Sequence, residues 1–259
     1  MSARVCALGV LGALALATVM LAPLTVAGAQ GMPRGVPHTT TMDMDSPNRV
    51  FTLADLLEYV PGGTGAIRAD GLAWIGGDYN RLYLRLDGTQ PFRGSGGDTE
   101  VDLTYGRLVT PFWTALAGGR VEVRGLGSSR RDTRTLLALG FEGLAPYWFE
   151  MEPTFYVSST GQVSGRFASS IDLYFTQRLI LQPRVETHFA VQQVRTLGIG
   201  SGVNDIELGA RMRYEFRREF APYIGLAWFR RTGATAGLAR RAGEAVRQAG
   251  LVAGVRMCR

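Results

Sequence analysis

The chain has 259 residues, of which 46% are hydrophobic and 19% charged, and its formal net charge is +6. Beyond the N-terminal segment, no apolar run reaches the length of about 20 residues that a membrane-spanning helix needs. All 28 basic residues are arginines, but they alternate with apolar residues and acids and form no long basic run, which argues against nucleic-acid binding.

Residues 1–29 have the pattern of a secretory signal peptide. Arg4 precedes a long apolar stretch, and Ala27 and Ala29 form a small-x-small cleavage site. We expect cleavage after Ala29 and export of the mature chain, with an N-terminal membrane anchor as the alternative. Cleavage also removes Cys6 and leaves Cys258 alone, which excludes a disulfide framework within one chain.

Residues 30–70 are predicted to form a flexible tail in the periplasm. Its first part, "QGMPRGVPHTTTMDMDSPNRV", is rich in Pro, Thr, Met and Asp and has no periodicity, which indicates disorder. The following "FTLADLLEYV" is compatible with a short amphipathic helix that ends at "PGGTG".

The tail carries four soft donor groups, on Met32, His38, Met42 and Met44. Thioether and imidazole groups suit copper, particularly Cu(I), and methionine is a sensible ligand where a thiol would oxidise. The sequence therefore predicts a copper site here. Four donors in a flexible segment are equally compatible with a plain linker.

Residues 71–259 have a hydrophobic period of two, which predicts an all-β domain. In "NRLYLRLDG", for example, Leu82, Leu84 and Leu86 share one face, and Arg81 and Arg85 lie on the other. About ten such segments have the length of about 9–11 residues that a tilted membrane-spanning strand needs. We predict an antiparallel up-and-down transmembrane β-barrel of about ten strands. The alternative is a soluble β-sandwich or lipocalin-like barrel, whose apolar faces would point inward.

The connections and the aromatic residues support the membrane barrel. Short turns such as "VTPF" and "LAPY" alternate with long Gly-rich loops, as in bacterial outer-membrane barrels. Aromatic side chains cluster beside the short turns, which predicts a girdle at the periplasmic interface that includes Tyr147 and Trp148. Pro153 and Pro183 count against the prediction unless bulges absorb them, because proline cannot donate to a strand ladder.

The inward faces carry acids and arginines that are expected to pair across strands, because buried charge is costly unless it is paired. The acids are Glu100, Asp102, Glu122, Glu142, Glu150, Glu152, Asp172, Glu186, Glu207 and Glu215, and the arginines are Arg85, Arg120, Arg134, Arg166, Arg184, Arg211 and Arg213. A cation site built from Glu150, Glu152 and Asp172 is a further hypothesis, although carboxylates alone do not specify a metal.

An enzymatic function finds little support in the sequence. His188 is the one histidine in the predicted barrel, and no nucleophile elbow, zinc-binding helix or nucleotide loop is present. A surface hydrolase that uses His188 is one alternative, and a structural or adhesive barrel without a metal role is another.

Several blocks of the chain resemble, in order, the copper resistance protein B family of outer-membrane proteins. They include "WIGGDYNRLYLR", "GLAPYWFEMEPTFYV", "FTQRLILQPRVE", "GIGSGVNDIELGARMRYEFRREFAPYIGLAW" and "GLVAGVR", and they run from about Glu58 to Arg256. The resemblance implies an exported outer-membrane barrel that serves copper tolerance by binding copper or passing it out of the periplasm. This chain departs from the family in two ways: its Met/His tail is thin, and it ends in "RMCR" where an aromatic residue would normally stand.

The sequence thus predicts a non-catalytic outer-membrane barrel that contributes to copper resistance. Its expected partners are outer-membrane lipid, copper ions and a periplasmic copper-binding protein, and no nucleic acid. Tail donors would capture copper, and lumen carboxylates would assist its retention or passage.

Overall fold

The computed structural model describes residues 48–60, 65–92, 96–126 and 131–259. Within these residues the chain forms one antiparallel sheet and short helical segments. The strands are β1 (Arg49–Val60), β2 (Ala66–Gly76), β3 (Asn80–Pro91), β4 (Gly97–Thr110), β5 (Trp113–Leu126), β6 (Asp132–Ala145), β7 (Phe149–Ser158), β8 (Val163–Ser170), β9 (Leu173–Tyr174), β10 (Leu179–Ala190), β11 (Gly202–Tyr214), β12 (Phe220–Arg231) and β13 (Arg247–Cys258). The helical segments are η1 (Pro146–Trp148), η2 (Arg195–Leu197) and α2 (Gly233–Arg241).

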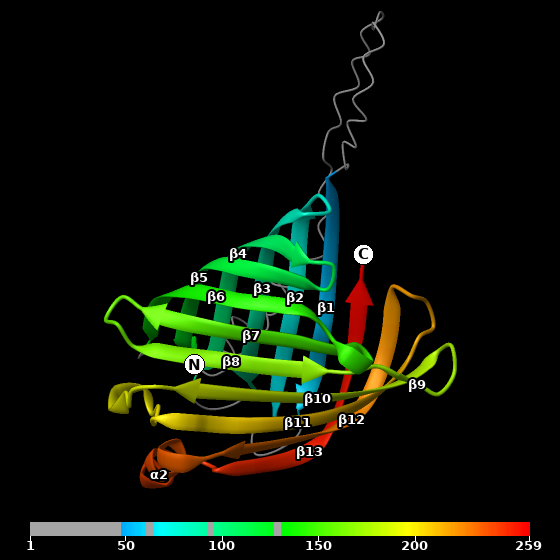
Figure 1. Cartoon of the computed structure of the whole chain (residues 1–259). Coiled ribbons are helices and arrows are strands. Elements are labelled where there is room, and N and C mark those ends of the chain that lie inside the picture. Colours follow the sequence, from blue (N-terminus) through cyan, green and yellow to red (C-terminus); the bar gives the residue numbers. More distant parts are fainter. Residues whose placement is uncertain (1–47, 61–64, 93–95, 127–130) are drawn as a thin grey trace, which may run out of the picture.

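The sheet closes on itself to form a barrel. Apart from β8 and β9, which both pair with β10, each strand pairs with its sequence neighbours, and β1 pairs with β13, which lies beside it in Figure 1. Two backbone hydrogen bonds of 2.8 Å between Thr52 and Arg259 extend this seam. β9 is a two-residue strand that follows β8 along the same edge of β10, so the wall has 12 strands. The prediction of an up-and-down barrel is confirmed, with 12 strands in place of about ten.

The additional strands come from residues that the sequence assigned to the tail. The helix considered for "FTLADLLEYV" is wrong, because Arg49–Val60 form β1, and β2 begins at Ala66 and not near residue 71. Leu53, Leu56 and Leu57 have the spacing of one helix face. Pairing with β2 and β13 supplies the backbone hydrogen bonds of this segment and overrides the local pattern.

Apolar side chains point out of the barrel, as the period of two predicts. On β6, Leu137 and Leu139 are 54% and 46% exposed, whereas Leu136 and Ala138, which alternate with them, are each 1% exposed. The same alternation places Leu103 and Tyr105 of β4 outside and Asp102 and Thr104 inside. This arrangement is the reverse of a soluble barrel, which would bury its apolar rows.

Exposed aromatic rings gather at the end of the barrel that carries the short turns. They lie in or directly beside the β2–β3, β4–β5, β6–β7, β9–β10 and β11–β12 connections and are Tyr79, Phe112, Tyr147, Trp148, Tyr174, Phe175 and Phe216. The predicted cluster of aromatics beside the turns is therefore present in the structure. Tyr147 and Trp148 both have positive φ, near 67° and 66°, a left-handed backbone that is uncommon for residues other than glycine.

The two prolines lie where the ladders are interrupted. Pro183 of β10 stands at the point where pairing with β8 ends, at Arg184, and pairing with β9 begins, at Leu181. Around Pro153, the pairing of β6 with β7 skips two positions between Gly140 and Gly143. Proline is tolerated here because the wall is discontinuous beside it, and not because of the bulges that the sequence led us to expect.

The opposite end carries the long loops, η2 and α2. The loops are tied together, since the backbone N–H of Gly200 donates to Thr235 Oγ1 at 2.9 Å and that hydroxyl donates to Asn204 Oδ1 at 2.9 Å. Among the residues described, no helix has the length and apolar character needed to cross a membrane.

Candidate functional site

The barrel interior is filled by charged side chains that alternate with the outward apolar rows. Most of the inward acids and arginines that the sequence predicted take part in ion pairs with each other. β1 and β2 add Asp55, Glu58, Arg68 and Asp70, which the sequence analysis missed because it assigned these strands to the tail. The charge alternation of "IRADG" is the signal that would have revealed part of this set.

Glu186 of β10 is the hub of the network. Its carboxylate accepts hydrogen bonds from Arg166 at 2.6 Å and Arg184 at 3.1 Å, and it lies 3.6 Å from Arg68. The side chain is only 4% exposed. Three guanidinium groups therefore surround one buried carboxylate, which compensates for the cost of removing these charges from water.

Arg120 of β5 forms a second, equally tight cluster. Its guanidinium donates to both oxygens of Asp102 at 2.5 and 2.6 Å and also to Glu100. The same group lies 3.9 Å from the centroid of the Tyr156 ring, a cation–π arrangement. Hydrogen bonds in two directions and one stacked face fix this side chain in a single position.

A third cluster joins strands at the barrel seam. Arg211 of β11 donates to the two oxygens of Glu58 of β1 at 3.0 and 2.9 Å. The Tyr223 hydroxyl of β12 donates to the same carboxylate at 3.2 Å. This bidentate pair connects the first strand to residues more than 150 positions away in sequence.

These clusters close the middle of the lumen. Arg120 and Arg166 are each 4% exposed, Glu186 is 3% and Arg211 is 2% exposed. A water-filled channel would leave such side chains accessible to solvent. Charged side chains thus fill the centre of the barrel.

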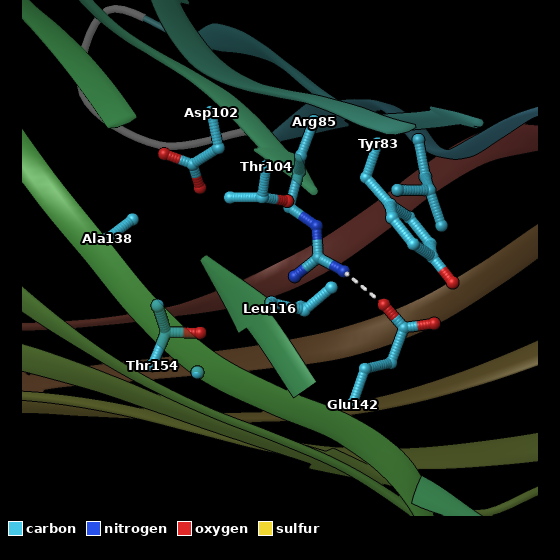
Figure 2. A pocket seen from close by; sticks show the side chains of 10 residues that line it. Tyr83, Arg85, Asp102, Thr104, Leu116, Ala138, Glu142 and Thr154 are labelled. Atoms are coloured by element: carbon cyan, nitrogen blue, oxygen red, sulfur yellow. Dashed lines mark hydrogen bonds and ion pairs between the residues drawn. The ribbon is translucent and has the colours of Figure 1, made fainter. Parts of the chain in front are cut away.

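Three cavities lie along the lumen. A vestibule of about 920 Å³ opens among the long loops, and its lining includes Glu100, Arg120 and His188. A central cavity of about 80 Å³ is bordered by these three residues and by Arg68, Arg85, Asp87, Asp102, Arg166 and Glu186. Figure 2 shows a pocket of about 20 Å³ nearer the short turns, where Arg85 reaches toward Glu142 beside Tyr83 and Thr154.

The three carboxylates that were predicted to bind a cation have different hydrogen-bond partners. Glu152 accepts hydrogen bonds from Arg85 at 2.5 Å and Arg166 at 3.3 Å, and both oxygens of Asp172 are bound by Arg213. Glu150 instead accepts from the Ser170 hydroxyl at 3.2 Å and is the most exposed of the three. Within the described ranges, no three His, Cys, Asp or Glu side chains are placed to hold a metal ion. Met32, His38, Met42 and Met44 lie outside the described residues.

His188 is held between two carboxylates at the floor of the vestibule. Its Nδ1 lies 2.8 Å from Asp205 Oδ1, and its Nε2 lies 3.7 Å from Glu186 Oε1. The hydrogen bond thus joins the imidazole to a carboxylate and not to a hydroxyl that could act as a nucleophile. This is the environment of a histidine that belongs to the ion-pair network.

Comparisons with known proteins agree with this architecture. The family model described as "Copper resistance protein B precursor (CopB)" matches residues 48–258. Copper resistance protein B of Escherichia coli is 43% identical over 188 residues, which is 71% of this chain and 60% of the relative. A Copper resistance protein B homolog of Pseudomonas syringae pv. tomato (strain ATCC BAA-871 / DC3000) is 36% identical over 221 residues, covering 85% and 73% of the two chains.

The fold also resembles that of a solved porin. The NanC porin structure matches with a TM-score of 0.51 at 12% identity, over 81% of this chain and 99% of the porin. At this identity the likeness concerns the fold alone. The chain spans 60% of the length of the Escherichia coli relative, which therefore has parts that are not matched here.

Proposed function

Because the chain belongs to the copper resistance protein B family, we propose that it contributes to copper resistance as an outer-membrane barrel that binds periplasmic copper and aids its export. The observation that carries this proposal is the family match across the whole barrel, residues 48–258. The proposed role involves no catalytic turnover. The chain itself would be exported by means of a signal peptide that is cleaved after Ala29.

The orientation in the membrane follows from the two ends of the barrel. Outer-membrane barrels place their short turns in the periplasm and their long loops outside the cell. β1 begins and β13 ends at the short-turn end, since Leu53 pairs with Cys258. The tail that precedes Arg49 would therefore enter the periplasm beside the mouth of the lumen, where a periplasmic copper-binding protein could deliver its metal.

The chemistry of this mouth supports a path from tail to lumen. Met32, His38, Met42 and Met44 offer soft donors that suit Cu(I). Among the described residues no arginine donates a hydrogen bond to Glu150, which lies at the same end of the barrel, so this carboxylate is available to a cation that enters. Glu152 and Asp172 lie in the same region but are neutralised by arginines, so a cation would have to compete with these partners.

Replacing the four tail donors together (Met32→Leu, His38→Gln, Met42→Leu, Met44→Leu) is expected to abolish most copper binding by the mature protein and to reduce growth in copper. Leucine keeps the size of methionine but removes the thioether ligand. Titration of the refolded protein with Cu(I) measures binding, and growth of a complemented deletion strain measures resistance. Glu150→Gln is expected to reduce binding less, and the exposed turn variant Glu219→Gln serves as its control. Unchanged copper binding and growth in the tail variant would favour a structural or adhesive barrel.

Leu139→Arg tests whether the outward face meets lipid. Leu139 lies midway along β6 and points outward, so a charge there is expected to cost about 2–4 kcal/mol of stability in phospholipid vesicles. Val109→Arg is the matched control, because Val109 is also exposed but lies beside the β4–β5 turn, where the cost falls to about 0–1 kcal/mol. Urea unfolding followed by tryptophan fluorescence measures both. Equal effects would contradict the proposed membrane position.

A further inference from the structure

The three cavities of the lumen form a series in which each neighbouring pair shares residues. Glu100, Arg120 and His188 border both the vestibule and the central cavity. Arg85 and Asp102 border both the central cavity and the pocket nearer the short turns. The row of cavities therefore runs from the loop end toward the turn end. One partition of side chains divides the vestibule from the central cavity, and a second divides the central cavity from the pocket nearer the short turns.

From this arrangement we propose that the lumen is a permeation path for small ions that two arginines, Arg120 and Arg85, keep closed in series. The inference deepens the proposed function, because it assigns the barrier that any passage of copper through the barrel would have to cross. It is argued from the cavities of the lumen and not from copper binding, and potassium chloride is the salt that tests it.

Arg120 closes the outer level. Its guanidinium is fixed by Asp102, Glu100 and the Tyr156 ring, and the residue is 4% exposed although it borders both the vestibule and the central cavity. Removing the guanidinium would leave the wall strands in place and open the partition between the vestibule and the central cavity.

Arg85 closes the inner level. It bridges Glu152 at 2.5 Å and Glu142 at 3.4 Å, and Figure 2 shows the contact with Glu142. Glu152 and Glu142 are 28% and 29% exposed, against 15% for Arg85 and 5% for Arg166, so the carboxylates are the more accessible side of this contact. Removing Arg85 would connect the solvent at that end with the central cavity.

Because the two barriers lie in series, removing one leaves the other closed. The single variants Arg120→Ala and Arg85→Ala are therefore expected to conduct little more than the unmodified protein. The double variant is expected to raise the conductance at least roughly tenfold, since the three voids then join. This non-additive pattern distinguishes a serial barrier from a general loosening of the barrel.

The measurement uses the mature full-length protein in planar bilayers in potassium chloride, with heat-dependent gel mobility as the test of folding. Arg134→Ala combined with Arg85→Ala is the matched control, because Arg134 lines the vestibule and contacts Glu122 and Gln162 but does not border the central cavity. If the double alanine variant does not fold, Arg120→Gln with Arg85→Gln replaces it, since glutamine is shorter and uncharged.

Resolved current steps in the folded Arg120/Arg85 double variant, with silent single variants and a silent Arg134/Arg85 control, would support the inference. Steady conduction by the unmodified protein would overturn it, as would a folded double variant that does not conduct. Equal conduction by a single variant and the double variant would also overturn it. Loss of copper binding in the tail variants bears on the proposed function alone, so the two ideas can fail separately.

Discussion

Replacing Glu186 by glutamine is expected to destabilise the folded barrel by about 3–5 kcal/mol, the cost of leaving buried charges without their partner. Glu186 holds Arg166 at 2.6 Å and Arg184 at 3.1 Å, with Arg68 at 3.6 Å. Glutamine keeps the shape of the side chain but removes its charge and one acceptor oxygen. The three guanidinium groups would lose the carboxylate that they share and keep only their separate partners. These are Glu152 for Arg166, Asp55 and Asp70 for Arg184, and Asp87 and Glu207 for Arg68.

The measurement is urea unfolding of the barrel in vesicles. Glu244→Gln is the control, because Glu244 is also paired with an arginine, Arg231, but is 56% exposed. An exposed pair contributes about 0–1 kcal/mol, so this variant should unfold close to the unmodified protein. A Glu186→Gln barrel as stable as the control would mean that other carboxylates satisfy the three arginines and that Glu186 is not the hub.

Whether a side chain points into or out of the barrel could be predicted from the sequence for most residues, because it depends only on the period of two. Arg120 and Glu186 were assigned to the lumen from their alternation with apolar residues, and both are buried there. The aromatic residues beside the turns were found for a similar reason, since short turns and their flanking residues are local in sequence. Neither inference required knowledge of which strand pairs with which.

The partners within the lumen could not be read in this way. Glu58 and Arg211 lie 153 positions apart, and their contact exists because β1 closes the barrel against β13, beside β12 and β11. The sequence of β1 resembles an amphipathic helix, so its two lumen acids, Asp55 and Glu58, were absent from the predicted set. Strand register across the closing seam is a property of the whole barrel, which a local pattern does not contain.

The copper prediction has a different basis. The tail donors were selected by their chemistry, and Met32 to Met44 lie outside the described residues. The barrel itself supplies carboxylates that are largely bound by arginines. A function in copper resistance therefore rests on the family and on the tail, and the barrel contributes a closed, charged lumen with Glu150 at its turn end.

Breaking the Arg211–Glu58 ion pair at the seam is expected to cause the second large loss of stability. Arg211→Met or Glu58→Leu alone is expected to destabilise the barrel by about 3–5 kcal/mol, because each leaves one buried charge unpaired. Both side chains are 2% exposed, so solvent cannot replace the missing partner. The defect would lie where β1 joins the sheet, and the closing strand should therefore unfold first.

Combining the two substitutions should restore most of the lost stability, since an apolar pair of similar volume often replaces a buried ion pair at little cost. The Tyr223 hydroxyl would lose its acceptor on Glu58, which costs about 1–3 kcal/mol, so Tyr223→Phe is added to the double variant. Urea unfolding of four proteins that all carry Tyr223→Phe (this variant alone, with Arg211→Met, with Glu58→Leu and with both) measures the coupling. Additive losses would show that the two charges do not depend on each other, and the seam would then be held by backbone pairing and not by this ion pair.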